Sequence, residues 1–246
     1  MTANITFDFT GRTVIVTGAA RGIGLALAQS FADADADADV VMVDFDATEL
    51  ATAAEAVGAL GVAADVSKTA DVERVVAAAV EKTGRVDVLV NNAGILRDRV
   101  LWKLTDDDWE QVLAVHAGGT FRFTRACVPH FRARQWGRII NVTSDTGLHG
   151  NRGQANYATA KAGIIGFTRT AAKELAIFGV TVNAISPNAA TRMTASIPEE
   201  KIAEVSGPIA RFADPSEITA AVCFLASEEA GYVTGVVLPV DGGLSI

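Results

Sequence analysis

The sequence lacks an apolar run long enough to cross a membrane. Half of its 246 residues are hydrophobic, yet the longest uninterrupted apolar runs fall well short of the ~18 residues that a membrane span needs. Met1 to Phe9 has no basic stretch followed by an apolar one, so we expect no signal peptide. The last three residues match neither a peroxisomal nor a reticulum-retention signal. We therefore expect a cytoplasmic protein.

The chain has only two cysteines, and its 21 basic residues are outnumbered by 29 acidic ones. Cys127 and Cys223 are far apart and show neither CxxC nor metal-ligand spacing, so we expect buried free thiols. The formal net charge of −8 argues against a nucleic-acid groove. Aspartate alternates with alanine from Asp33 to Asp39, where mutual repulsion favours a solvated loop over a metal site. No metal is therefore expected.

Short β-branched runs alternate with stretches of helical length along the chain. Strands are expected at 13–16, 39–43, 61–64, 86–90, 138–142, 181–185 and 236–239. Because parallel strands need crossover connections, this order predicts one α/β domain over residues 1–246. Its expected form is a Rossmann-type, doubly wound, seven-stranded parallel sheet with helices on both faces.

A glycine-rich turn, residues 17–24, follows the first expected strand and opens the first helix. Glycine lets the backbone turn sharply and approach a pyrophosphate. The helix N-terminus adds unpaired N–H groups and a partial positive charge. A plain structural turn can look the same, and the position between strand and helix is what favours a dinucleotide site. The residues assigned to it are Gly18, Arg21, Gly22, Ile23 and Gly24.

Asp44 lies twenty residues after Gly24, at the end of the second expected strand. A carboxylate there can accept hydrogen bonds from the adenosine ribose hydroxyls. It would also repel a 2′-phosphate, so Asp44 favours NAD over NADP. Arg21 would attract that phosphate and acts in the opposite sense. An N-cap of the next helix is the structural alternative for Asp44.

The third and fourth expected strands also end in candidate cofactor residues. Asp65 and Val66 follow the third strand, where they could reach an adenine ring. Asn92, Ala93 and Gly94 follow the fourth. Ligands of open α/β sheets bind at the carboxyl ends of strands, which favours cofactor contact here, although this segment could equally be an ordinary turn.

Tyr157 and Lys161 are four residues apart in a helical stretch, so they share one face. Tyrosine titrates near ~10, and a nearby ammonium with an oxidised nicotinamide would lower that pKa and make the phenol a usable base. Such pairs are common on helix surfaces. Ser144, at the end of the fifth strand, strengthens the hypothesis because its hydroxyl could bind a substrate oxygen.

Together these motifs resemble the short-chain dehydrogenase/reductase family over essentially the whole chain. The resemblance includes the turns at 17–24 and 91–94, the residues Ser144, Tyr157 and Lys161, and the segments 182–187 and 232–243. It implies that Tyr157 is the general acid/base, that Lys161 binds the nicotinamide ribose, and that Ser144 orients the carbonyl. It also implies cofactor contacts for Thr143, Pro187, Asn188, Tyr157 and Lys161.

The sequence departs from the family at His116, where an Asn is usual. That Asn is thought to anchor a water that relays protons to the lysine. His116 could do so with one ring nitrogen, so we count it as a catalytic candidate, with a histidine that merely packs in a helix as the alternative.

The substrate is predicted from a narrower resemblance. Segments 91–99, 115–116, 150–157 and 186–193 are similar to the (3R)-hydroxyacyl-CoA dehydrogenase domain of peroxisomal multifunctional enzyme type 2. That resemblance implies NAD-dependent oxidation of a (3R)-hydroxyacyl-CoA, with a steroid-derived acyl-CoA or hydroxysteroid as variants. Arg97, Arg99, Arg152 and Arg192 are candidates to meet the substrate phosphates.

Two alternatives remain open. A 3-oxoacyl-carrier-protein reductase is similar at 153–157 but usually prefers NADPH, which Asp44 opposes. A non-catalytic dinucleotide-binding scaffold is the alternative from another class. A substrate lid is expected near 191–207, and the resemblance implies a homotetramer or homodimer acting on a small molecule, without nucleic acid or membrane partners.

Overall fold

A computed structural model gives the fold of the chain and describes residues 6–33, 36–195 and 197–246. Two residues of the Asp/Ala run, 34 and 35, lie outside the described residues, so the predicted loop is described only at its two ends. Cys127 and Cys223 are buried and free, as expected.

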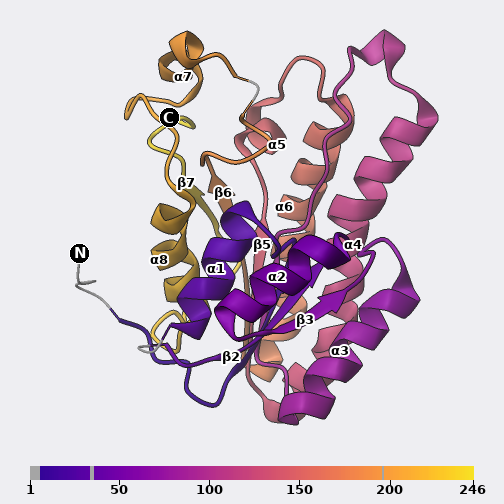
Figure 1. Cartoon of the computed structure of the whole chain (residues 1–246), viewed down its shortest axis with the longest axis vertical. Coiled ribbons are helices and arrows are strands. Elements are labelled where there is room, and N and C mark those ends of the chain that lie inside the picture. The colour runs from indigo at the N-terminus through magenta and orange to yellow at the C-terminus, as the bar shows by residue number, and fades with distance from the viewer. Residues whose placement is uncertain (1–5, 34–35, 196) are drawn as a thin grey trace.

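Seven strands form one parallel sheet within the described residues, in the order β3-β2-β1-β4-β5-β6-β7 (Figure 1). The strands are β1 (Thr13–Thr17), β2 (Asp39–Asp44), β3 (Leu60–Ala63), β4 (Val88–Asn91), β5 (Gly137–Val142), β6 (Val180–Pro187) and β7 (Val237–Val240). Each predicted strand is present, with ends shifted by up to two residues. The predicted doubly wound α/β fold is confirmed.

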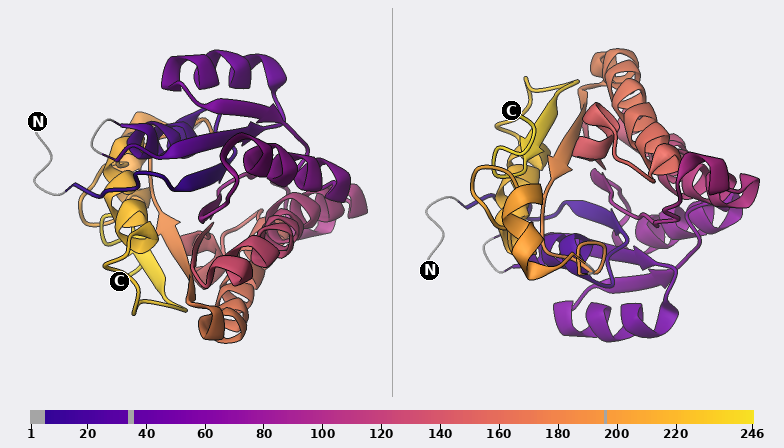
Figure 2. Two further views of the ribbon diagram at one scale, coloured as in Figure 1. Left: turned by 90° about the horizontal axis from the view of Figure 1, so that it is seen from below. Right: turned by 90° about the horizontal axis from the view of Figure 1, so that it is seen from above.

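Helices connect the strands and cover both faces of the sheet (Figure 2). They are α1 (Gly22–Ala32), α2 (Ala47–Val57), α3 (Thr69–Thr83), α4 (Asp106–Arg134), α5 (Asp145–His149), α6 (Ala155–Leu175), α7 (Glu199–Val205) and α8 (Pro215–Ala226), with short 3-10 turns at Leu101–Lys103 and Ala176–Phe178. Reciprocal capping boxes start α4 at Thr105 and α8 at Asp214.

Side-chain alternation along the strands builds two separate cores. Val14 and Val16 of β1 face the layer that contains α1 and α8, whereas Ile15 between them faces α3, α4 and α6. Every residue of β1 is buried. Because the strands are buried on both faces, their sequences are continuous β-branched runs rather than alternating apolar and polar residues.

The strand order reverses between β1 and β4, which is a topological switch point. The loops that follow β1, β2, β4, β5 and β6 therefore converge at one end of the sheet. No helix among the described residues is long and apolar enough to span a membrane.

Candidate active site

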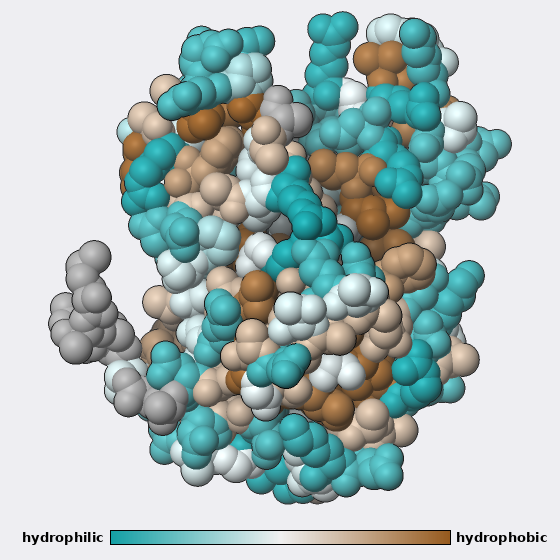
Figure 3. Space-filling view, in the orientation of Figure 1, coloured by the Kyte–Doolittle hydropathy of each residue, from teal (hydrophilic) through white to brown (hydrophobic). Residues whose placement is uncertain are grey.

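A large pocket opens at the carboxyl ends of the strands, with a volume of about 1120 Å³. Figure 3 shows the surface hollowed between the α7 region and the tops of α4 and α6, with apolar residues in the walls. All predicted site residues except Gly24 line it: Gly18, Arg21, Gly22, Ile23, Asp44, Asp65, Val66, Asn92, Ala93, Gly94, His116, Thr143, Ser144, Tyr157, Lys161, Pro187 and Asn188.

The glycine turn is held tightly against the β4 segment. Gly18 has φ +65°, and a Cβ there would lie 2.8 Å from the Cα of Ala93. A Cβ on Gly24 would lie 2.0 Å from the carbonyl oxygen of Gly18, which explains why Gly24 sits beneath the pocket rather than in its wall. Asn92 Nδ2 donates to the carbonyl oxygens of Thr17 (2.9 Å) and Gly18 (3.1 Å). The turn therefore requires both glycines.

The N-terminus of α1 has no side-chain cap. Its N-cap, Arg21, makes no side-chain cap bond, and the first turn carries no acidic residue. By contrast, α2 is capped by Asp46, whose carboxylate accepts from the N–H groups of Thr48 and Glu49. Unpaired N–H groups and the helix dipole make the α1 terminus suited to an anion.

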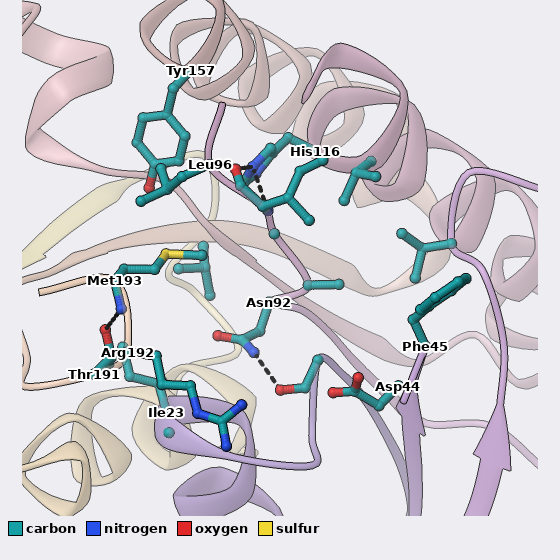
Figure 4. Close-up of a pocket in the computed structure, with 18 of the residues that line it drawn as sticks. Ile23, Asp44, Phe45, Asn92, Leu96, His116, Tyr157, Thr191, Arg192 and Met193 are labelled. Atoms are coloured by element: carbon teal, nitrogen blue, oxygen red, sulfur yellow. Dashed lines mark hydrogen bonds between the residues drawn. The ribbon is translucent and has the colours of Figure 1, made fainter. Parts of the chain in front are cut away.

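Asp44 is fixed beside this turn. Its Oδ2 accepts from the N–H of Ala20 at 3.1 Å, and its Oδ1 accepts from the N–H of Asp46 at 3.1 Å. Asp44 is therefore not the N-cap of α2, and the structural alternative for this residue does not apply. Figure 4 shows Asp44 at one side of the pocket beside Phe45, whose ring is 80% exposed.

Arg21 does not stand free in the pocket wall. Its guanidinium forms an ion pair with Glu49 of α2. The same carboxylate accepts from Arg192 Nη2 at 2.9 Å. Of the four arginines proposed for substrate phosphates, Arg97 and Arg192 line the pocket, and Arg99 instead pairs with Asp108 at 2.8 Å.

Asp65 and Val66 form the pocket wall beyond β3. Asp65 Oδ1 accepts from the N–H of Ser67 at 2.9 Å, which closes a short turn. Val66 packs on α4, where a Cβ on Gly119 would lie 3.0 Å from Val66 Cγ2. Both residues thus line the pocket.

Tyr157, Lys161 and Ser144 meet at the opposite end of the pocket (Figure 4 labels Tyr157). Lys161 is buried, and its Nζ donates to the carbonyl oxygen of Val142 at 2.7 Å. The ammonium lies 5.4 Å from the centre of the Tyr157 ring. Thr143 fixes the helix beneath, because its Oγ1 donates to the carbonyl oxygen of Lys161 at 2.8 Å.

In the chain alone, the pKa of Tyr157 lies above its ordinary value. Burial raises it to about 12, and the charge of Asp98 acts in the same sense, whereas a hydrogen bond with Ser144 lowers it. Burial also lowers the pKa of Lys161 to about 7. The lysine points toward Val142 rather than compensating for the desolvation of the phenol, so the protein residues alone do not lower the pKa of Tyr157.

His116 of α4 packs directly on the tyrosine. The two rings are 5.1 Å apart and nearly perpendicular, at 88°. His116 Nε2 lies 2.8 Å from the carbonyl oxygen of Ile95 and 3.1 Å from its N–H, so it donates to one or accepts from the other. Burial, and then the charge of Lys161, lower the pKa of His116 to about 3. The imidazole is therefore neutral, with Nδ1 unpaired among the described residues.

Asn188 closes the pocket beside β6. Its N–H donates to the carbonyl oxygen of Val240 at 3.1 Å, and its own carbonyl oxygen accepts from the N–H of Ala213 at 3.1 Å. The side-chain Nδ2 is buried and finds no partner within the described part of the chain. A buried amide donor in a pocket wall is suited to a polar group of a ligand.

The comparisons with known proteins agree with this geometry. Residues 18–245 match the family model described as enoyl-(acyl carrier protein) reductase. The chain is 42% identical to the 3-oxoacyl-[acyl-carrier-protein] reductase of Synechocystis sp., over 96% of this chain and 97% of that protein. It is also 42% identical to the 3-oxoacyl-[acyl-carrier-protein] reductase FabG of Thermotoga maritima, over 96% and 98%.

An uncharacterized oxidoreductase of Mycobacterium bovis is 44% identical, over 94% of this chain and 96% of that protein. The chain belongs to the short-chain dehydrogenase/reductase family. The predicted family, and the prediction of an oxidoreductase that acts on CH–OH groups, are confirmed. The comparisons support the carrier-protein reductases as relatives and lend no support to the peroxisomal hydroxyacyl-CoA dehydrogenase domain.

A nicotinamide dinucleotide, the cofactor class of this family, fits the residues present. The uncapped α1 terminus suits its pyrophosphate, and the unpaired Asn188 Nδ2 belongs to a residue that lines the same pocket. Gly18 and Gly22 have φ of +65° and +57°, which L side chains rarely adopt. Whether the cofactor is NAD or NADP is a separate question.

Several residues in the pocket wall or beside it were not predicted from the sequence. Phe45 directly follows Asp44, and an apolar residue just past a strand end was an available signal. Asn156, whose Nδ2 donates to the carbonyl oxygens of Arg97 and Asp108 at 3.1 Å, links α6 to the segment after β4 and to the first turn of α4. The sequence did not indicate a role for Glu49, because its partner Arg192 lies 143 positions away.

Proposed function

We propose that this short-chain reductase interconverts a 3-oxoacyl thioester and its 3-hydroxyacyl form, with the acyl group on acyl carrier protein as the favoured substrate. The observation that carries the proposal is the meeting of Tyr157, Ser144 and Lys161 at one end of a dinucleotide-sized pocket. The carrier-protein reductases that are 42% identical over almost the full length support this substrate class.

Tyr157 is proposed as the proton donor and acceptor for the substrate oxygen. Ser144, which lines the same end of the pocket, would bind the same oxygen and hold it in line. When bound, the nicotinamide cofactor supplies or accepts the hydride. In reduction the carbonyl oxygen takes the Tyr157 proton, and in oxidation the phenolate takes the alcohol proton.

Lys161 is proposed to hold the nicotinamide ribose and to favour the phenolate form. Its pKa of about 7 allows it to exchange a proton at neutral pH. The positive charge of an oxidised nicotinamide would lower the pKa of Tyr157 from the value of about 12 that burial sets.

His116 is proposed to take part in the proton relay toward Lys161. Its neutral ring and unpaired Nδ1 leave one nitrogen free to bind a water. The hydrogen bond between Nε2 and Ile95 would fix the ring in place while Nδ1 acts.

NAD is proposed as the preferred dinucleotide. Asp44 is held by two backbone N–H groups, so its carboxylate cannot easily swing away from an added 2′-phosphate. The cofactor contacts proposed are those of the pocket wall: Gly18, Arg21, Gly22, Ile23, Asp44, Asp65, Val66, Asn92, Ala93, Gly94, Thr143, Tyr157, Lys161, Pro187 and Asn188, with Gly24 beneath them.

The second candidate function is NAD-dependent oxidation of a (3R)-hydroxyacyl-CoA. Asp44 is the observation that favours it, because NAD is suited to oxidation in cells. The segment from Thr191 to Gly207, which carries α7, is proposed as the lid over either substrate. Met193 of this segment lines the pocket and lies near Tyr157 in Figure 4.

A steady-state screen tests the proposal. A 3-oxoacyl group is offered on acyl carrier protein and on CoA, with NADH and with NADPH, and (3R)-hydroxybutyryl-CoA is offered with NAD and NADP. We expect the highest kcat/KM for the carrier-protein thioester with NADH. Higher kcat/KM for the CoA oxidation would favour the second candidate. Absence of turnover with every pair would leave a dinucleotide-binding scaffold.

A further inference from the structure

Glu49 joins two parts of the pocket that are far apart in sequence. One carboxylate oxygen pairs with Arg21 of the glycine turn, and the other accepts from Arg192 Nη2 at 2.9 Å. Arg192 belongs to the segment after β6, and its neighbour Thr191 lies over Gly22, where a Cβ would be 3.6 Å from Thr191 Cγ2. One carboxylate thus binds both guanidinium groups.

These pairs lie at the adenosine end of the pocket. Arg21 and Arg192 line the pocket together with Asp44, which Figure 4 shows on the opposite wall from Arg192. Asp44 is the residue expected to meet the ribose hydroxyls. Arginine binds phosphate through a planar fork of donors, so either guanidinium is chemically suited to a 2′-phosphate if it is free.

The two ion pairs are weak as sources of stability. The side chains of Arg21 and Arg192 are 41% and 71% exposed, and surface pairs contribute little to folding. Their effect on ligand charge is larger, because one carboxylate pairs with two of the cations that line the pocket. A structural role alone would not require both arginines to face the cofactor pocket.

We propose that Glu49 is a specificity-determining residue that disfavours NADP by holding Arg21 and Arg192 away from the ribose 2′-position. Asp44 repels the phosphate directly, whereas Glu49 withdraws the cations that would attract it. The inference rests on the proposed dinucleotide function of this pocket. It concerns the ratio of the affinities for NAD and NADP rather than the identity of the acyl substrate.

The test is the dissociation constant of each dinucleotide for Glu49→Gln, measured by titration calorimetry on the full chain. Glutamine keeps the length of the side chain and leaves the Asp46 cap of α2 intact. We expect NADP to bind at least tenfold more tightly than to the wild type, while NAD changes less than threefold. Adding Arg21→Met and Arg192→Met to Glu49→Gln should remove the gain.

Glu55→Gln is the matched control, because it removes the same charge from an exposed position of the same helix. The inference is wrong if Glu49→Gln leaves the NAD:NADP ratio unchanged, if Glu55→Gln shifts it equally, or if the gain survives loss of both arginines. A wild type that binds neither dinucleotide overturns the proposed function as well. A wild type that binds NAD, with an unchanged ratio in Glu49→Gln, overturns only the role of Glu49.

Discussion

The two ends of the pocket are built in different ways. At the adenosine end, main-chain groups dominate: the free N–H groups of α1, two glycines with positive φ, and Asp44 fixed by backbone donors. At the reacting end, side chains dominate, and Lys161, Tyr157 and His116 all have pKa values moved far from their ordinary range.

The two ends differ in the kind of free-energy cost that they impose on the folded protein. The adenosine end is constrained in conformation, because few residues other than glycine can adopt its backbone angles. At the reacting end the cost is the loss of solvation, since His116 and Lys161 are buried and lie 5.1 Å and 5.4 Å from the ring of the partly buried Tyr157. Substitutions at the first end should therefore affect folding and binding, and those at the second should affect chemistry and pH dependence.

The largest effect is expected at the reacting end. Tyr157→Phe should lower kcat at least about a thousandfold, because it removes the proton donor, while the dissociation constant of the dinucleotide changes little. Tyr232→Phe is the matched control, since Tyr232 is the other tyrosine of the chain and is fully exposed. Steady-state rates and calorimetry measure both. A Phe variant that keeps most of its turnover would remove Tyr157 from the mechanism.

The next effect is conformational and lies at the adenosine end. Gly24→Ala should reduce the free energy of unfolding by about 3 kcal/mol, because its Cβ would lie 2.0 Å from the carbonyl oxygen of Gly18. Gly166→Ala, in the open face of α6, has no atom within 4 Å of its Cβ and should be neutral or stabilising. Urea denaturation compares the two. Equal stabilities would contradict the close packing of the turn.

The buried imidazole should make stability depend on pH. His116 has a pKa of about 3 in the folded protein and 6.5 when exposed. Between these values the unfolded chain binds more protons, so stability is lost as pH falls from 6.5 toward 3. Relative to His116→Gln, the wild type should lose about 2 kcal/mol more between pH 7.5 and pH 5.

Urea denaturation at the two pH values measures this loss, and His130→Gln on the same helix should behave as the wild type does. If the wild type and His116→Gln lose equal stability, His116 is charged or accessible in the folded protein.

The smallest effect concerns the choice of dinucleotide. Asp44→Asn should improve NADP binding about tenfold, or about 1.4 kcal/mol, because the amide keeps the shape of the side chain without its charge. The wild type should itself bind NAD at least about tenfold more tightly than NADP. Titration of both dinucleotides measures the two ratios. Equal wild-type affinities for NAD and NADP would show that Asp44 does not discriminate between them.

Local sequence was enough to locate the strands and the glycine-rich turn. The β-branched runs predicted all seven strands, and the glycine spacing located the turn, because these features depend on backbone preferences within a few residues. The position of Asp44 at a strand end was likewise visible. By contrast, the raised pKa of Tyr157 in the chain alone could not be predicted, since a helical i,i+4 spacing does not indicate how deeply the pair is buried.

The sequence by itself determined a parallel α/β sheet, its family, and the kinds of side chain that reach one edge of it. Only the tertiary structure decided the ionisation of Lys161 and His116, the capture of Arg21 and Arg192 by Glu49, and the unpaired amide of Asn188. Solvent exclusion and contacts between residues more than a hundred positions apart arise when the layers pack together, so no local pattern encodes them.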